Sequence, residues 1–131
     1  SLHGLTRGTT RAHIARATLE GIAWQVYCAF GSMSTDAAQK IERLRVDGGA
    51  AANNLLMQIQ ADQLQCRIER AEVVESTAFG VVLLAGLGAG LFTSLEQVAA
   101  MNRVRTTFTP GDFDEDGRDL WMSALERENG R

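Results

Sequence analysis

The residues whose types and spacing best suit ligand binding are Asp47, Gly48, Gly49 and Asn53. They follow residues 41–46, where apolar and charged side chains alternate, a pattern that predicts a β-strand. Two consecutive glycines at a strand end let the backbone approach a ligand with no side chain in the way. A helix beginning just after them would direct its free amides and positive dipole end at the same turn, which favours anionic or purine-bearing ligands.

We expect this helix to cover residues 51–64. Asn53, one turn into it, would then face the glycine turn and could hydrogen-bond the edge of a base or a ribose. The alternative is a tight strand-to-helix turn that binds no ligand, because paired glycines are common at such turns. Periodicity alone favours this structural alternative, so ligand binding at the turn is a hypothesis at this point.

Other candidate groups are weaker. His3 and His13 have no carboxylate or cysteine neighbours at the spacing of metal ligands, and His13 is expected to be a surface or packing residue near a helix start. The acidic residues between positions 112 and 119 resemble a calcium-binding loop but lack its final glutamate. A solvated turn that leads into a helix N-terminus explains them better. No P-loop, nucleophile-elbow or zinc-protease motif is present, and we expect no metal ligands.

The composition is that of one ordinary globular domain. The chain has 131 residues, 45% of them hydrophobic and 22% charged, with a net charge of −3. This charge provides no basic surface for nucleic acid or membranes, so we expect neither as a partner. The longest apolar stretch, residues 79–92, is interrupted by glycines and falls short of the ~18 residues of a membrane helix. Cys28 and Cys66 lie outside any CxxC pattern, and we expect reduced thiols in a cytoplasmic protein.

The apolar pattern predicts alternating helices and strands, which indicates α/β layering. Thr9 or Thr10 is expected to cap the first helix. The helix over residues 78–88 is apolar all round, so we expect it to be buried on most sides. The expected helices cover residues 11–33, 51–64, 78–88 and 114–128, with a short one from residue 94, and the expected strands cover 41–46, 66–69 and 104–108.

So few strands leave a small sheet with open edges and uncovered apolar faces. We expect either a copy of the chain or strands from another part of a longer protein to complete it. The chain also begins without a methionine and runs directly into patterned sequence. Both features indicate a piece of a longer protein.

Several stretches, taken together, resemble the FGGY carbohydrate kinases. Gly4-Leu5 and the later stretch HIARATLE (13–20) are similar to the second signature of that family, whose upstream part would precede residue 1. The glycerol kinase branch in particular is similar over nearly the whole chain. The stretches that carry this likeness are GLTRGTT (4–10), RVDGGAAANN (45–54), LMQIQAD (56–62), ERAEVVESTAFG (69–80) and FTPG (108–111).

This resemblance implies an RNase H-like α/β fold of the actin and hexokinase-type ATPase superfamily. Residues 1–131 would form the C-terminal portion of the C-terminal, nucleotide-binding kinase domain, with the N-terminal domain absent. Carried over residue by residue, the family's adenosine contacts fall on Gly49 and Asn53, and Asp47 and Gly48 shape the turn. The resemblance therefore favours ADP or ATP as the ligand of the turn.

The implied activity is the ATP-dependent conversion of glycerol to sn-glycerol 3-phosphate and ADP. No catalytic residue is expected here, because the family's catalytic aspartate would lie upstream of residue 1, and Mg²⁺ would be bound mainly by the missing part. We expect the fragment alone to be inactive, the implied partners to be nucleotide and glycerol, and the protein to be a homo-oligomer. The alternatives are an FGGY kinase for another polyol or sugar such as xylulose, and a stand-alone self-associating module without catalysis.

Overall fold

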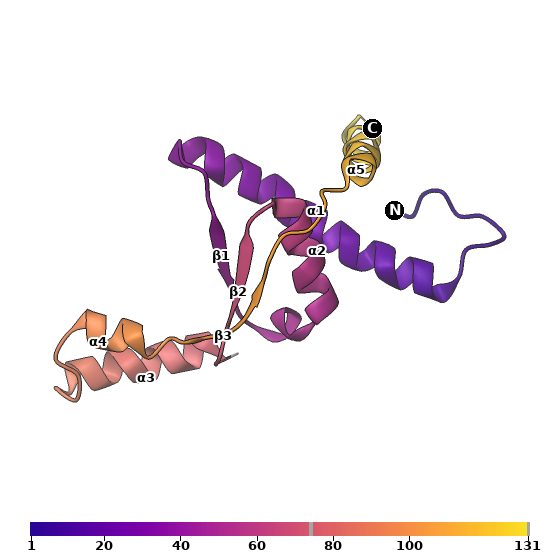
Figure 1. Ribbon diagram of the computed structural model, residues 1–131. Coiled ribbons are helices and arrows are strands. Elements are labelled where there is room, and N and C mark those ends of the chain that lie inside the picture. Colours follow the sequence, from indigo (N-terminus) through magenta and orange to yellow (C-terminus); the bar gives the residue numbers. More distant parts are fainter. Residues whose placement is uncertain (74, 131) are drawn as a thin grey trace.

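The computed structural model describes residues 1–73 and 75–130, and Figure 1 shows the course of the chain. Helices and strands follow one another in the order predicted from the sequence. They are α1 (Arg11–Ala37), β1 (Arg43–Val46), the 3₁₀ helix η1 (Gly49–Ala52), α2 (Asn54–Leu64), β2 (Arg67–Ala71), α3 (Ser76–Gly88), α4 (Leu95–Ala100), β3 (Val104–Phe108) and α5 (Glu115–Asn129). No helix within these described ranges is both long and apolar enough to cross a membrane.

The three strands form one sheet in the order β1-β2-β3. β1 and β2 are parallel, with Leu44 opposite Ile68, and the connection between them contains η1 and α2. β3 returns antiparallel to β2, with Phe108 opposite Ile68. Because side chains alternate between the faces of a strand, Leu44, Ile68 and Phe108 share one face, and Arg70, two residues beyond Ile68, lies on it too.

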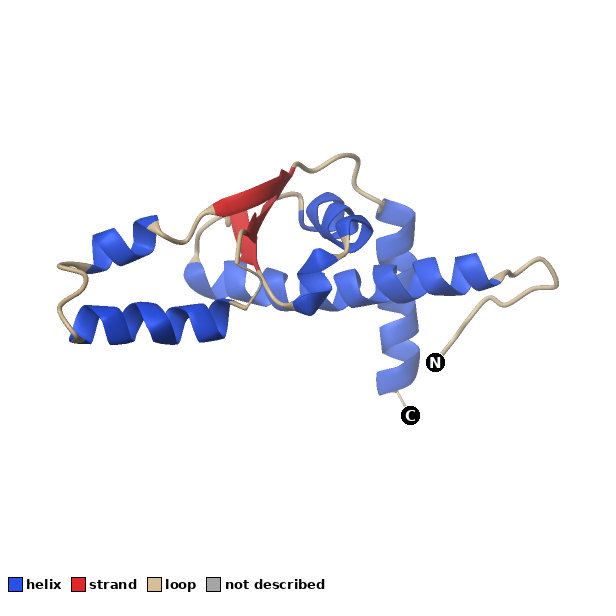
Figure 2. Ribbon diagram, turned by 90° about the horizontal axis from the view of Figure 1, so that it is seen from below, coloured by secondary structure: helices blue, strands red, loops and turns tan. Residues whose placement is uncertain are grey.

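That face of the sheet is covered by α1 and α2, as Figure 2 shows, and the core lies between these layers. Leu44 and Phe108 pack against the core from the edge strands. Its buried residues are Ala23, Ala51, Leu56, Met57, Ile59, Ala61, Leu64, Cys66 and Ile68. Ala51 is the member of η1 in this cluster, so the segment that follows the glycine turn is anchored in the core.

Thr10 caps α1, in agreement with the sequence prediction. Its Oγ1 accepts a hydrogen bond from the backbone N–H of His13, and Nδ1 of His13 accepts one from the backbone N–H of Thr10. Two free amides at the helix start are thereby satisfied reciprocally. His13 is an exposed residue at the helix start, which explains its presence without metal chemistry.

The predicted start of the second helix is wrong. Instead of one helix over residues 51–64, the chain makes the short 3₁₀ helix η1 and then begins α2 at Asn54. The reason is that Asn53 has extended backbone angles, with φ −80° and ψ 106°, and acts as the N-cap of α2. Asparagine favours this position because its side-chain oxygen can accept from the first free amides of a helix.

The expectation that the third helix is buried on most sides is also wrong. In α3 only Leu83 and Gly86 are buried, whereas Val81, Val82 and Leu84 are more than half exposed. α3 and α4 extend away from one end of the sheet in Figure 1. The apolar composition of α3 favours a helix that is covered on most sides. Within the described residues, α3 packs mainly on α4 and on the segment that connects them. In that segment the Phe92 ring lies so close to Gly86 that a Cβ there would have no room.

Candidate functional site

The glycine turn joins the end of β1 to η1. Gly48 has φ +79° and ψ 175°, a combination that essentially only glycine adopts. Its carbonyl oxygen accepts a hydrogen bond from the N–H of Ala51 at 3.1 Å, and the carbonyl of Ala50 accepts from the N–H of Asn53 at the same distance. The chain needs Gly48 to reverse direction at this point, whatever else the turn does.

Gly49 is different, because nothing nearby explains its lack of a side chain. Its φ lies outside the left-handed region, and a Cβ added to it would meet no atom of the described residues within 4 Å. Gly49 is also exposed. The space beside it is therefore open to an approaching molecule, which is what the sequence hypothesis requires of this position.

Asn53 lies at the end of the same turn, where α2 begins. Its Oδ1 accepts a hydrogen bond from the backbone N–H of Leu56 at 3.1 Å. The Nδ2 group, which carries two N–H donors, makes no hydrogen bond within the described part of the chain. The structure thus brings Gly48, Gly49 and Asn53 together on one turn, with Asn53 as the N-cap and not one turn into the helix.

Asp47 is exposed and borders a hollow of about 80 Å³. That hollow lies on the other side of the strand ends and is not lined by Gly49 or Asn53. Beside it, Arg45 of β1 and Glu69 of β2, which are opposite each other in the register, form an ion pair at 3.3 Å. The glycine turn is therefore separate from this hollow.

Sequence reasoning missed Arg70, the side chain that holds the turn from β2. Its Nη1 donates to the carbonyl oxygen of Ala51 at 2.9 Å and to Oδ1 of Asn54 at 2.8 Å. A signal was available, because alternation from Ile68 places position 70 on the buried face of the strand, where a charged residue needs partners.

Comparison with known proteins identifies the family of this chain. The profile of the FGGY family of carbohydrate kinases, C-terminal domain, matches residues 1–89 and so includes the glycine turn. The chain belongs to the FGGY carbohydrate kinase family. The resemblance drawn from the sequence is confirmed.

Close relatives of this FGGY chain include the glycerol kinase of Rhodopirellula baltica, which is 49% identical over 129 residues. The glycerol kinase of Aromatoleum aromaticum is 48% identical over 134 residues. The alignments cover 96% and 99% of this chain, but only 24% and 27% of those proteins. The chain thus spans about a quarter of the length of the curated relatives it matches.

Among solved structures, Plasmodium falciparum glycerol kinase with ADP matches 97% of this FGGY chain and 26% of that protein, with a TM-score of 0.81 and 34% identity. The xylulose kinase of Lactobacillus acidophilus matches with a TM-score of 0.73 at 21% identity, which supports the fold alone. The expected α/β fold of the actin and hexokinase type, as part of a C-terminal kinase domain, is therefore confirmed.

The other polar clusters of this FGGY chain are structural. Asp114 is the N-cap of α5 and accepts from the N–H of Gly117 at 2.9 Å, which accounts for one of the acidic residues between positions 112 and 119. Within residues 1–73 and 75–130, no group of three or more His, Cys, Asp or Glu side chains is arranged to hold a metal ion.

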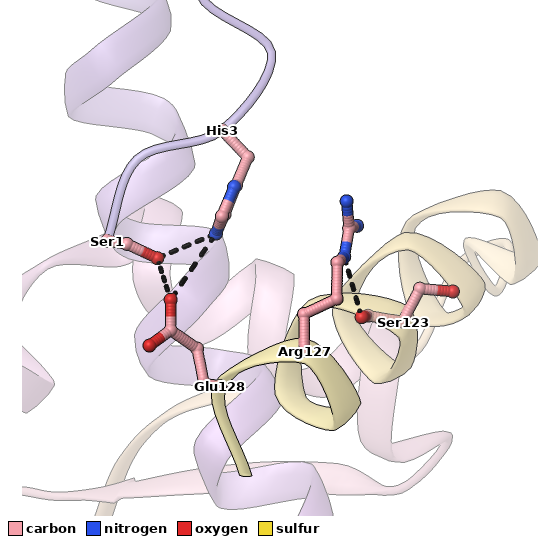
Figure 3. Close-up of polar contacts among 5 residues, drawn as sticks. All are labelled: Ser1, His3, Ser123, Arg127 and Glu128. Carbon is pink, nitrogen blue, oxygen red and sulfur yellow. Dashed lines mark hydrogen bonds and ion pairs between the residues drawn. The ribbon is translucent and has the colours of Figure 1, made fainter. Parts of the chain in front are cut away.

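Ser1, His3 and Glu128 form a small network near the two chain ends (Figure 3). The three residue types are those of a hydrolase triad, but the arrangement is not. The Ser1 hydroxyl contacts both Nε2 of His3 and the Glu128 carboxylate, and that carboxylate also faces Nε2, at 3.6 Å, instead of orienting the other ring nitrogen. The hydrogen bond from Ser1 lowers the pKa of Glu128. The network ties the N-terminal segment to α5.

Proposed function

We propose that this chain is the C-terminal portion of the nucleotide-binding domain of a cytoplasmic, ATP-dependent glycerol kinase, and that its glycine turn holds the adenosine part of ATP or ADP. The whole enzyme would transfer the γ-phosphoryl group of ATP to a terminal hydroxyl of glycerol, giving sn-glycerol 3-phosphate and ADP. Phosphoryl transfer depends on positioning and on stabilisation of charge. The contribution of this chain is the positioning of the nucleotide.

The observation that carries this proposal is the open side of Gly49 beside the free amide group of Asn53. A purine or ribose ring could lie against Gly49 without meeting a side chain, and Nδ2 of Asn53 could donate to its polar edge. Asp47 and Gly48 set the direction of the chain as it enters the turn.

The relatives favour glycerol over other acceptors. Glycerol kinases of 46–49% identity align with nearly the whole chain, and the Plasmodium falciparum enzyme was crystallised with ADP. The xylulose and gluconate kinases that share the fold are 21–25% identical. Because glycerol-contacting residues are not identified among these 131, the substrate is inferred from relatives and not from the turn.

We assign no catalytic residue to this chain. The Mg²⁺ that accompanies ATP would be held mainly by residues outside this chain, as would the base that accepts the glycerol proton. Residues 1–131 alone should consequently show no glycerol-dependent ATP turnover. Measurable turnover by this polypeptide would contradict the proposal.

An NMR titration with ADP tests nucleotide binding at the turn directly. We expect the amide signals of Gly48, Gly49 and Asn53 to shift and to saturate, even if millimolar ADP is needed. Adenosine should shift the same signals, whereas inorganic pyrophosphate should not, because the turn is proposed to bind the nucleoside. A folded chain whose turn signals do not respond to ADP would contradict the assignment.

We also propose that the protein is a homo-oligomer, as expected from the sequence. In residues 1–131 alone, β1 and β3 are edge strands whose outer backbone groups have no strand partner in the described part of the chain, so two copies could pair there. Such edges pair readily with other chains. Light scattering over a concentration series should give a mass that rises above the 14.2 kDa of the monomer. A constant monomer mass at the highest concentration would contradict self-association.

A further inference from the structure

Arg70 connects η1 and the start of α2, which adjoin the glycine turn, to the strand β3. From β2, its Nη1 donates to the carbonyl of Ala51, to Oδ1 of Asn54 and, at 3.4 Å, to the carbonyl of Ala52. Its Nη2 donates to Oγ1 of Thr106 on β3 at 3.2 Å. The guanidinium group also lies 5.3 Å from the centre of the Phe108 ring, a cation–π distance.

The charge of Arg70 is directed at backbone groups. The last carbonyl groups of a short helix have no partner within the helix and carry a partial negative charge. In η1 these include the carbonyls of Ala51 and Ala52, which point to the guanidinium. Among the described residues Arg70 forms no ion pair with a carboxylate. Its fork of donors holds η1 against the sheet.

Holding η1 fixes the two ends of the proposed nucleotide site. Gly49 is the first residue of η1, and Asn53 follows its last residue. Asn54, whose side chain faces Arg70 and not the turn surface, secures the start of α2 to the same group. The two adjacent asparagines thus have different roles: Asn53 would contact the ligand, whereas Asn54 accepts a hydrogen bond from Arg70.

We propose that Arg70 is a positioning residue for nucleotide binding: it holds Gly49 and Asn53 in the arrangement that accepts the adenosine. This inference rests on the proposed function of the turn and extends it to a residue that does not touch the ligand. The hydrogen bonds need a planar group with several donors in fixed directions, which lysine does not provide.

The test compares Arg70→Met, Arg70→Lys and Arg67→Met in the full 131-residue chain. Arg70→Met keeps the apolar stem over Phe108, and Arg67→Met is the matched control, because Arg67 is exposed on the opposite face of the same strand. Without ligand, the amide signals of residues 49–54 should move in both Arg70 variants and not in the control. ADP should bind about tenfold more weakly to Arg70→Met, the loss expected for hydrogen bonds to a charged group, with Arg70→Lys in between.

Each result separates this inference from the proposed function. If the unaltered chain binds no ADP, the nucleotide role of the turn fails, and the positioning role fails with it. If the unaltered chain and Arg70→Met bind ADP equally, the turn keeps its function and only the inference about Arg70 is overturned. Should Arg70→Met not fold, Arg70→Lys decides, because ADP affinity equal to that of the unaltered chain would also overturn it. Equal weakening in Arg67→Met would mean that strand stability, not Arg70, controls the affinity.

Discussion

Asn53 and Leu56 are joined by a hydrogen bond of 3.1 Å from the backbone N–H of Leu56 to Oδ1 of Asn53. The residue proposed to contact the nucleotide is therefore also the N-cap of α2. Its two functions use different atoms, because the cap needs the oxygen whereas the ligand would be bound by Nδ2. Substitutions can separate the two.

Asn53→Ser should keep the N-cap of α2 and lose the two N–H donors of Nδ2. A serine hydroxyl accepts from the same amide, so stability should change little, whereas Asn53→Ala should lower the free energy of unfolding by about 1 kcal/mol. Both variants should bind ADP several-fold more weakly than the unaltered chain. Urea unfolding and ADP titration measure the two effects independently. Full ADP affinity in Asn53→Ser would exclude Nδ2 as a ligand contact.

The two glycines of the turn should respond in opposite ways. Gly48→Ala forces a side chain into a backbone region suited to glycine and should cost about 1–3 kcal/mol of stability. Gly49→Ala meets no neighbour, so stability should stay the same or rise by up to about 1 kcal/mol, while ADP binding weakens because the methyl group occupies the ligand's place. Gly88→Ala at the end of α3 is the control for a harmless exposed substitution. Gly49→Ala with unaltered ADP affinity would show that the open space is not used.

Much of this architecture could be predicted from residue patterns. Alternation predicted the three strands, and the paired glycines marked the turn, because both signals depend on local geometry. The start of α2 was misplaced because residues 51–52 were assigned to this helix, whereas they belong to η1 and Asn53 has the extended backbone of an N-cap. This segment is in contact with Arg70 of β2, and that contact between residues distant in sequence cannot be read from local patterns.

The exposure of α3 and the role of Arg70 could not be predicted, for a related reason. The apolar composition of α3 predicts that other residues cover this helix. It does not predict which element covers it. Val82 is 64% exposed here although its neighbours in the helix are equally apolar. Likewise, the alternation along β2 predicts that Arg70 lies on the face of the sheet that packs on the core. Its hydrogen-bond partners, however, belong to η1, α2 and β3, which are distant in sequence.

Gln63 is a buried polar residue whose replacement should stabilise the chain. Its side chain is 3% exposed, and its Oε1 has no hydrogen-bond partner among the described residues. Because a buried unpaired acceptor costs about 1–3 kcal/mol, Gln63→Met should raise the free energy of unfolding by roughly 1 kcal/mol.

Gln58→Met is the matched contrast on the same helix. Gln58 donates to Asp62 and to the carbonyl of Thr109, so its loss should be destabilising. Urea unfolding of both variants checks the opposite signs, and a destabilised Gln63→Met would contradict the argument.

Cys66 should make the stability of the chain fall at alkaline pH. The thiol is 2% exposed, and desolvation by burial raises its pKa above the ordinary value. The folded state therefore favours the neutral thiol, and its stabilising effect is fully present below the ordinary thiol pKa of about 8.5 and is lost as the pH rises through the folded value. Cys66→Ala should lower the overall stability but flatten this decline, whereas Cys28→Ala, at a half-buried site, should leave it steep.

Iodoacetamide should also alkylate Cys28 faster than Cys66 in the folded chain. Equal alkylation rates together with an unchanged alkaline slope in Cys66→Ala would show that Cys66 is accessible to solvent.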